Sequence, residues 1–309
     1  MAAVVRKVLR ALLSVWFVVT VIFVVMRLSG DPALEIFGPE ELPEEVMASF
    51  RATWGIDKPI WEQYLTYVGN VLQGDFGRSF VEYRSASEIV MERLPKTLAL
   101  MAASLAITLL IGIPAGIAAA LFHNGRLDRV LTVGGMVFYA TPNFVLGIAL
   151  ILVFSVWLGV LPVASSEAWE SILLPAFTFG ASGAAVFLRF VRAAMLDALR
   201  QPYVLAARAR GLPWRRVVLG HVLPNAALPI LTIAGLTVGA MVAGSIVVET
   251  MFAWPGIGRL TTTAVGFRDL AVIQVIVFLV MAAMVITNLV VDVLYVVVDP
   301  RIRIAKAPL

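Results

Sequence analysis

Residues 201–225, QPYVLAARARGLPWRRVVLGHVLPN, form a polar, arginine-rich interval in an otherwise hydrophobic chain. Pro202 suits the first turn of a helix, where its missing N–H costs no hydrogen bond, and residues 203–210 then predict two helical turns. Gly211 is typical of the position after a helix end, and Pro213 can open a second short helix. The interval therefore predicts a compact helix–turn–helix between hydrophobic segments.

Composition places the chain in a membrane. It has 309 residues, of which 61% are hydrophobic and only 14% charged, whereas an average soluble domain has about 25% charged residues. Several apolar runs also exceed the roughly 20 residues that a helix needs to cross a bilayer. With no cysteine and a net charge of +4, disulfides and thiolate ligands are excluded and nothing supports a nucleic-acid partner.

The hydrophobic runs predict an all-α integral membrane protein with six transmembrane helices. The predicted spans are residues 11–26, 97–121, 130–161, 172–196, 228–248 and 271–298. The first could be a cleaved signal, but no small-x-small site follows it, which favours a retained helix. The third is too long for one straight crossing, and Thr141-Pro142 predicts a bend in it.

Residues 29–96 differ in kind from the rest, with twelve acidic and six basic side chains. Short helices are predicted at 44–53 and 60–72. Because these 68 residues contain few apolar groups, they predict a small cap rather than an independent domain. The predicted division is an N-terminal transmembrane helix (1–28), the cap (29–96), a five-helix core (97–298) containing the 201–225 loop, and a tail (299–309).

The distribution of basic residues orients the protein. If the N-terminus is cytoplasmic, fifteen of the 24 Lys and Arg residues fall in cytoplasmic segments, as the positive-inside rule requires. Both termini and the 201–225 loop are then cytoplasmic, and the 29–96 insertion is extracytoplasmic.

Ionisable side chains inside the spans are few. Glu249 ends the fifth span, where it has either a role at the outer gate or a hydrogen bond that orders the following loop. Arg189 and Arg192 close the fourth span and are predicted to snorkel to the surface. With two histidines and no cysteine, no metal site is expected.

The arginine-rich interval resembles the signature loop of ABC-importer permeases. Ala206-Ala207, Gly211 and Leu223-Pro224 match that motif, while Leu205 stands where the family has Glu. Further stretches resemble markers of the B-type permease of the bacterial oligopeptide and dipeptide importers: Gly30-Asp31-Pro32, residues 55–59, 74–79 and 94–98, Thr141-Pro142, residues 249–258 and 299–303. The chain is identified as a member of that family, with the type I importer fold.

The resemblance implies that the loop is a coupling helix that docks into a groove on an ATPase subunit. The implied coupling residues are Tyr203, Ala206, Ala207, Arg208, Arg210, Gly211, Leu212 and Pro213. Implied partners are a second homologous permease, two ATPase subunits that bind ATP and Mg, an extracytoplasmic substrate-binding protein and a peptide substrate in a bacterial inner membrane. The chain itself has no Gly-x-x-x-x-Gly-Lys-Ser/Thr phosphate loop, so no cofactor is expected on it.

The fifth span contains small residues at three- and four-residue spacings: Gly235, Gly239, Ala240, Ala243 and Gly244. Such a face allows close helix packing, either at the seam between the two permeases or within this subunit. Candidates for the translocation pathway are Thr232, Thr237, Met241, Ser245 and, as a gate, Glu249.

Three alternatives to a peptide importer remain. The same architecture could carry a nickel complex, glutathione or a sugar. An ion-coupled carrier would place paired ionisable groups near the middle of the membrane, and the spans contain almost none. A membrane-embedded enzyme would need a nucleophile–base or two-carboxylate constellation at depth, which is missing from the sequence.

Overall fold

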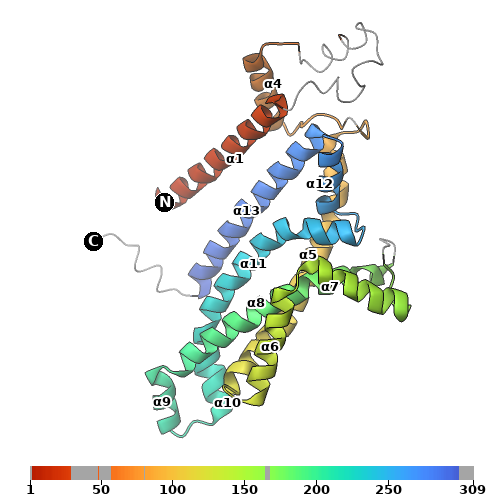
Figure 1. Cartoon of the computed structure of the whole chain (residues 1–309). Helices are drawn as coiled ribbons and strands as arrows, with labels where there is room; N and C mark the ends of the chain where they lie inside the picture. The colour runs from red at the N-terminus through yellow and green to blue at the C-terminus, as the bar shows by residue number, and fades with distance from the viewer. Residues whose placement is uncertain (1, 29–47, 49–56, 80, 164–167, 299–309) are drawn as a thin grey trace. The chain divides into compact units, whose positions relative to one another are not determined.

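The computed structural model of the chain describes residues 2–28, 48, 57–79, 81–163 and 168–298. In these ranges the regular elements are all helices, with one isolated β-bridge between Arg78 and Ser85 (Figure 1). The chain divides into two compact units, one of Met1–Glu92 and Thr261–Ala282, the other of Arg93–Leu260 and Ala283–Leu309. We describe each unit by itself.

The longer helices are α1 (Ala2–Leu28), α4 (Ile60–Leu72), α5 (Ala86–Leu121), α6 (Arg126–Ala140), α7 (Asn143–Leu150), α8 (Leu173–Leu199), α9 (Pro202–Ala209), α11 (Leu223–Met251), α12 (Ile257–Gly266) and α13 (Leu270–Val298). Short pieces connect them: a π-helical turn at Ile151–Trp157, a 3₁₀ turn at Trp169–Ile172, α10 (Trp214–Val217) and a second π-helical turn at Val218–Val222. By length and composition, three of the described helices can cross a membrane, or five if each bent pair is one span. The all-helical membrane fold predicted from the sequence is confirmed, and six spans remain the predicted number.

Most predicted helices occur close to their predicted positions, but α1 and α5 begin nine and eleven residues before the predicted spans 11–26 and 97–121, so that α5 starts within the predicted cap. The predicted helix 60–72 is α4, and the predicted bend separates α6 from α7 at Thr141-Pro142, where the chain turns by 101°. This break is much sharper than a tilted span requires. α11 begins five residues before the predicted 228, because Pro224 fits its first turn. The predicted helix 44–53 lies outside the described residues except for residue 48.

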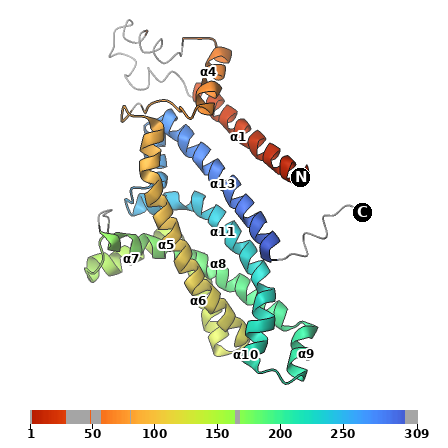
Figure 2. The same ribbon diagram turned by 180° about the vertical axis from the view of Figure 1, so that it is seen from behind.

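In the second unit, α8 is the central helix, and α6, α7 and α11 all pack against it (Figure 2). Glycines allow α5 to approach it closely: a Cβ built on Gly112 would lie 2.5 Å from the Cβ of Phe187, and one on Gly116 would lie 2.6 Å from the Cβ of Val191. On the α8 side, a Cβ on Gly180 would lie 2.7 Å from the carbonyl oxygen of Ser104. This close small-residue packing is typical of membrane helices, which lack a strong hydrophobic drive to associate.

In the first unit, α1 and α4 pack through aromatic rings. Phe23 of α1 meets Tyr64 edge-on and stacks on Tyr67, with ring centroids 5.2 and 5.4 Å apart. The Thr20 and Tyr64 hydroxyls form a 2.7 Å hydrogen bond. Beyond α4, the buried Ser79 hydroxyl donates to the Asp269 carboxylate just before α13. The predicted cap thus has ordered contacts to α1 and to the residue that precedes α13, within its own unit.

Candidate functional site

The arginine-rich loop (residues 201–225) folds as two short helices joined by a left-handed turn. α9 starts at Pro202 and ends at Ala209, and Pro213 caps α10. Between them Gly211 has φ +78°. Its N–H donates to the Arg208 carbonyl at 2.9 Å, and the Leu212 N–H donates to the Ala207 carbonyl at 3.3 Å. This is the Schellman arrangement, so the predicted helix–turn–helix is present.

One face of the arginine-rich loop is anchored in the core and the other is exposed. Val204 and Ala207 are buried, and both pack with Val217, Val218 and Leu212 in one hydrophobic cluster. Of the predicted coupling residues, Ala207 is therefore buried and Leu212 partly buried, whereas Tyr203, Ala206, Arg208, Arg210, Gly211 and Pro213 are exposed. The Ala206-Ala207 pair thus has the Ala207 methyl buried in the protein and the Ala206 methyl on the exposed face.

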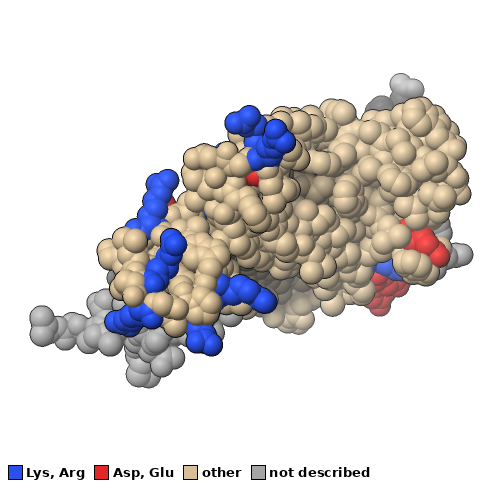
Figure 3. All heavy atoms as spheres, turned by 90° about the horizontal axis from the view of Figure 1, so that it is seen from below, with Lys and Arg blue, Asp and Glu red and all other residues tan. Residues whose placement is uncertain are grey.

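The exposed face is positively charged. The loop has four arginines (Arg208, Arg210, Arg215 and Arg216) and no acidic residue, and all four are exposed. The Arg208 guanidinium lies over the Trp214 ring, 5.5 Å from its centroid, which links α9 to α10. In Figure 3, which views the molecule from below, several Lys and Arg side chains stand out around the end where α9 and α10 lie.

An ion pair joins α6 to α8, with the Asp128 carboxylate buried and the Arg192 guanidinium partly exposed. The Arg192 guanidinium donates to both Asp128 oxygens, at 2.6 and 2.7 Å, and the Asn124 N–H and Thr132 hydroxyl donate to the same carboxylate. The carboxylate that Arg192 binds lies 64 residues away in the sequence, and the snorkelling of Arg192 to the membrane surface stays a prediction. Removing Arg192 would leave the Asp128 carboxylate without its positive partner, which is destabilising.

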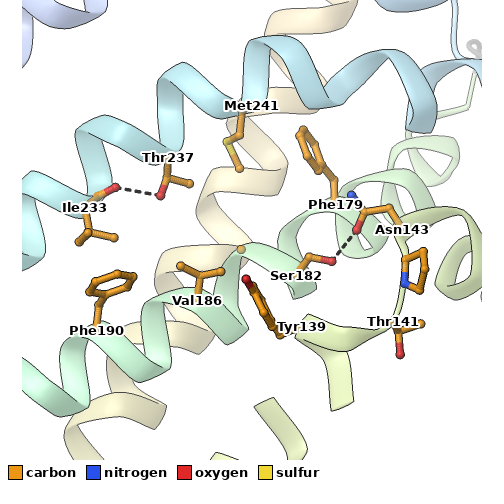
Figure 4. A pocket seen from close by; sticks show the side chains of 12 residues that line it. Tyr139, Thr141, Asn143, Phe179, Ser182, Val186, Phe190, Ile233, Thr237 and Met241 are labelled. Atoms are coloured by element: carbon orange, nitrogen blue, oxygen red, sulfur yellow. Dashed lines mark hydrogen bonds between the residues drawn. The ribbon is translucent and has the colours of Figure 1, made fainter. Parts of the chain in front are cut away.

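A large cavity of about 590 Å³ opens between the α6–α7 bend, α8 and α11 (Figure 4). Its lining is Tyr139, Thr141, Pro142, Asn143, Phe179, Ser182, Gly183, Val186, Phe190, Ile233, Thr237 and Met241, with no charged side chain among them. The Ser182 hydroxyl donates to the Asn143 amide oxygen at 2.5 Å, and the Thr237 hydroxyl donates to the Ile233 carbonyl at 2.8 Å. The cavity has the size and the mostly apolar lining, with a few polar groups, of a small-molecule site.

A smaller cavity of about 460 Å³ lies between the C-terminal end of α8, the N-terminal end of α11 and the start of α9. It is lined by Phe190, Ala193, Ala194, Asp197, Ala198, Gln201, Tyr203, Asn225 and Pro229. Tyr203 therefore belongs both to the arginine-rich loop and to a cavity wall, which brings the loop next to the groove between α8 and α11.

The predicted pathway residues are separated by the structure. Thr237 and Met241 line the large cavity, and Thr232 lines neither cavity. Ser245 and Glu249 are buried, at 2% and 0% exposed. Of the small-residue face, residues 239, 240, 243 and 244 lie outside those whose side chains are described.

Glu249 is the hydrogen-bonding centre of the turn between α11 and α12. Its carboxylate accepts from the Thr97 hydroxyl at 2.9 Å and from the Arg259 N–H at 3.2 Å, and also from the Gly258 N–H and the Ser245 hydroxyl. It therefore caps the N-terminus of α12, where unpaired N–H groups favour a negative charge. Gly256 leaves room for it, since a Cβ there would clash with both Glu249 and Thr97.

Of the two roles predicted for Glu249, these contacts match the hydrogen bond that orders the following loop, whereas α12 was not predicted from the sequence. The only local signal was the Trp254-Pro255-Gly256 turn, whereas Thr97 lies 152 residues from Glu249. Among the described residues, no three His, Asp or Glu side chains come together as metal ligands. A groove between membrane helices, an exposed basic loop beside it and no nucleotide-binding loop in the sequence are features of transport permeases.

Comparison with known proteins agrees with that class. Residues 112–304 match the family described as binding-protein-dependent transport system inner membrane component, and residues 1–101 match the N-terminal family of such membrane components. The chain is 41% identical over 304 residues to the glutathione transport system permease protein GsiC of Escherichia coli (strain K12), covering 97% of this chain and 98% of that one. The corresponding protein of Salmonella choleraesuis (strain SC-B67) is 44% identical over 288 residues, covering 92% and 93%.

Solved structures show the same fold at lower identity. An inward-facing crystal form of the MetNI methionine ABC transporter matches with a TM-score of 0.59 at 19% identity, over 69% of this chain and 97% of that one. An amino acid ABC transporter crystallised with histidines matches with a TM-score of 0.54 at 18% identity, over 68% and 94%. The chain belongs to the binding-protein-dependent transport system inner membrane component family. It is the multi-pass, inner-membrane permease subunit of an ABC importer of the peptide-transporter type, and not a catalytic subunit.

Proposed function

We propose that this permease forms one half of a translocation pathway for di- and oligopeptides and works by alternating access. A second, homologous permease supplies the other half, two ATPase subunits bind ATP and Mg, and an extracytoplasmic protein delivers the peptide. The termini and the arginine-rich loop are cytoplasmic, and residues 29–96 are extracytoplasmic, in agreement with the basic-residue distribution.

The observation that carries this proposal is the position of the arginine-rich loop at one end of the α8–α11 groove. Tyr203 lines the smaller cavity, while Arg208 and Arg210 on the same helix are exposed. A protein that binds α9 can therefore move groove residues directly. Nucleotide binding to that partner then shifts the groove between its two accessible states, to the extent that the partner binds the two states differently.

The peptide cargo is supported by the relatives. GsiC is named as a glutathione transport permease, and glutathione is a tripeptide. The uncharged large cavity suits a solute whose backbone amides hydrogen-bond to hydroxyl and amide groups. Ligand selection is expected to be made first by the binding protein, which leaves the groove permissive.

The test is reconstitution of the whole transporter in liposomes with its binding protein. We expect ATP hydrolysis and uptake to be stimulated by dipeptides, short oligopeptides or glutathione. Stimulation by a nickel complex or a sugar alone would overturn the peptide cargo and leave the ABC importer intact. Uptake that follows an ion gradient without ATP would overturn the ATP-driven mechanism itself.

A further inference from the structure

The two cavities lie along one continuous face of α8. Six of their lining residues on this helix are Phe179, Ser182, Val186, Phe190, Ala193 and Asp197. Neighbouring members of this set are three or four residues apart. From the first to the last is 18 positions, which is five turns at 3.6 residues per turn, so the six side chains lie on one face of the helix. At 1.5 Å per residue this face is about 27 Å long, close to the roughly 30 Å of the hydrocarbon core.

α11 also contributes to the walls of both cavities. Asn225 and Pro229 line the smaller cavity, while Ile233, Thr237 and Met241 line the larger one, each four residues after the last. The residues that line the two cavities thus follow one another along α11. The two cavities are therefore successive chambers of one groove rather than unrelated hollows.

Phe190 is the one described residue that lines both chambers. Its side chain is 49% exposed, whereas Phe187 and Phe179 on the same helix are 0% and 9% exposed and belong to the core. In Figure 4 the Phe190 ring lies beside Ile233 at one end of the large chamber, with Asn143 and Phe179 toward the other end. An exposed aromatic ring at the junction of two chambers is where the groove can be narrowed.

Charge is nearly absent along this route. Of the described lining residues in both chambers, only Asp197 carries a charge, although the chain has 24 Lys and Arg residues. The groove therefore has little means of selecting solutes by the charge of their side chains. Apolar constrictions, by contrast, exclude water and ions when nothing fills them.

We propose that Phe190 is the constriction of this subunit's half of the pathway, and that it screens cargo by width rather than by charge. This rests on the proposed transport function. The ring closes the passage between the chambers when no cargo is present and is displaced by a peptide that fits. The structure assigns Phe190 as a specificity-determining residue for peptides with bulky side chains.

The test compares Phe190→Ala, Phe190→Leu and Phe190→Trp in the reconstituted transporter. For Phe190→Ala we expect a several-fold increase in uptake of a peptide with bulky side chains relative to dialanine, together with ATP-independent leak of a small neutral solute. Phe190→Trp should lower the uptake of the bulky peptide relative to dialanine. The uptake ratio of Phe190→Leu should lie between those of wild type and Phe190→Ala. Peptides of equal width bearing Lys or Glu should enter at similar relative rates in all variants.

Phe144→Ala is the matched control. Phe144 is 51% exposed and lines neither chamber, so its loss should leave both the uptake ratio and the leak unchanged. Unchanged ratio and leak in every Phe190 variant, with ATP hydrolysis retained, would overturn the proposal, as would an equal effect of Phe144→Ala. If wild type transports no peptide, the proposed cargo fails, and the leak of the neutral solute through Phe190→Ala still tests the constriction.

Discussion

The turn after α9 and the turn after α11 close their helices in the same way. After α9, the N–H groups of Gly211 and Leu212 donate to backbone carbonyls of the helix. After α11, the Ala253 N–H donates to the Thr250 backbone carbonyl at 3.2 Å and the Trp254 N–H to the Glu249 backbone carbonyl at 2.8 Å. Both turns place one residue in the left-handed region, with φ +78° at Gly211 and +49° at Ala253. The backbone motif is shared, but the residue that makes it differs.

Their surroundings explain the difference. Gly211 is exposed, and a Cβ built on it would meet nothing within 4 Å, so its own conformational freedom makes the turn. Ala253 is held by its neighbours: the Arg259 guanidinium donates to its carbonyl at 2.7 Å, and the Trp254 indole donates to the Lys96 carbonyl at 3.0 Å. A strained left-handed residue persists only where the surrounding structure fixes it. The first turn is thus built locally and leaves its surface open to a partner, and the second is built by long-range contacts.

The largest effect is expected from Glu249→Ala in the second turn. The substitution leaves the Thr97 hydroxyl and the N–H groups at the start of α12 without their acceptor. Each buried donor left unpaired costs about 1–3 kcal/mol, so we expect a loss of about 3 kcal/mol or more. The measurement is the thermal midpoint of the purified transporter, followed by gel filtration after heating.

Glu88→Ala is its control, because Glu88 is an exposed carboxylate whose contact to Arg84, at 3.9 Å, lies at the surface. Exposed ion pairs contribute only about 0–1 kcal/mol, so the midpoint should hardly move. Equal midpoints for Glu249→Ala and Glu88→Ala would show that the second turn does not depend on the buried carboxylate. The second turn would then, like the first, be stabilised by its own backbone rather than by long-range contacts.

A smaller effect on stability, but a large one on transport, is expected from Gly211→Val in the first turn. A residue with a side chain at φ +78° lowers the free energy of unfolding by about 1–2 kcal/mol, and by somewhat more when the side chain is β-branched. We expect the protein to remain in the membrane. Peptide-stimulated ATP hydrolysis and uptake should fall, because the changed turn tilts α10 away from the ATPase subunit that is proposed to bind the loop. Gly211→Asn should restore much of the activity, because Asn tolerates this conformation.

Gly220→Val separates conformation from bulk. Gly220 is also exposed, with nothing within 4 Å of a built Cβ, but it is not among the residues with positive φ. Its substitution should leave transport near the wild-type level. Normal transport by Gly211→Val would count against a coupling role for the arginine-rich loop.

The difference between the two turns also shows what the sequence could predict. The first was predictable because Pro202, Gly211 and Pro213 are local signals whose effect does not depend on distant residues. The bend at Thr141-Pro142 and the limits of α4 followed from signals of the same kind. The partners of Glu249 and Arg192 could not be predicted, since Thr97 and Asp128 lie 152 and 64 residues away, and no periodicity in the sequence relates such positions.

The groove was predictable only in part. Thr237 and Met241 were candidates because they lie on the fifth span, but Phe190 and Asn143 carry no signal that distinguishes them from ordinary span residues. Their importance follows from the faces that α8 and the α6–α7 bend turn toward α11. Helix faces in a membrane are set by packing, and a chain that is apolar all round gives little indication of which face lines a pathway.

The smallest expected effect is that of Ala253→Gly, the reverse exchange in the second turn. Glycine removes a strain of about 1 kcal/mol at φ +49°, but it adds about 0.5–1 kcal/mol of chain entropy to the unfolded state. The two terms nearly cancel, so the thermal midpoint should stay close to that of wild type. Hydrogen exchange of the Phe252, Ala253, Trp254 and Gly256 amides should be unchanged, because Glu249 still holds the turn. At Gly211, by contrast, Gly→Ala should lower the midpoint, since nothing around that residue compensates the strain. If Ala253→Gly instead lowered the thermal midpoint as much as Gly211→Ala, the conformation of each turn would depend on its own left-handed residue. The hydrogen bonds around Glu249 would then not be what fixes the second turn.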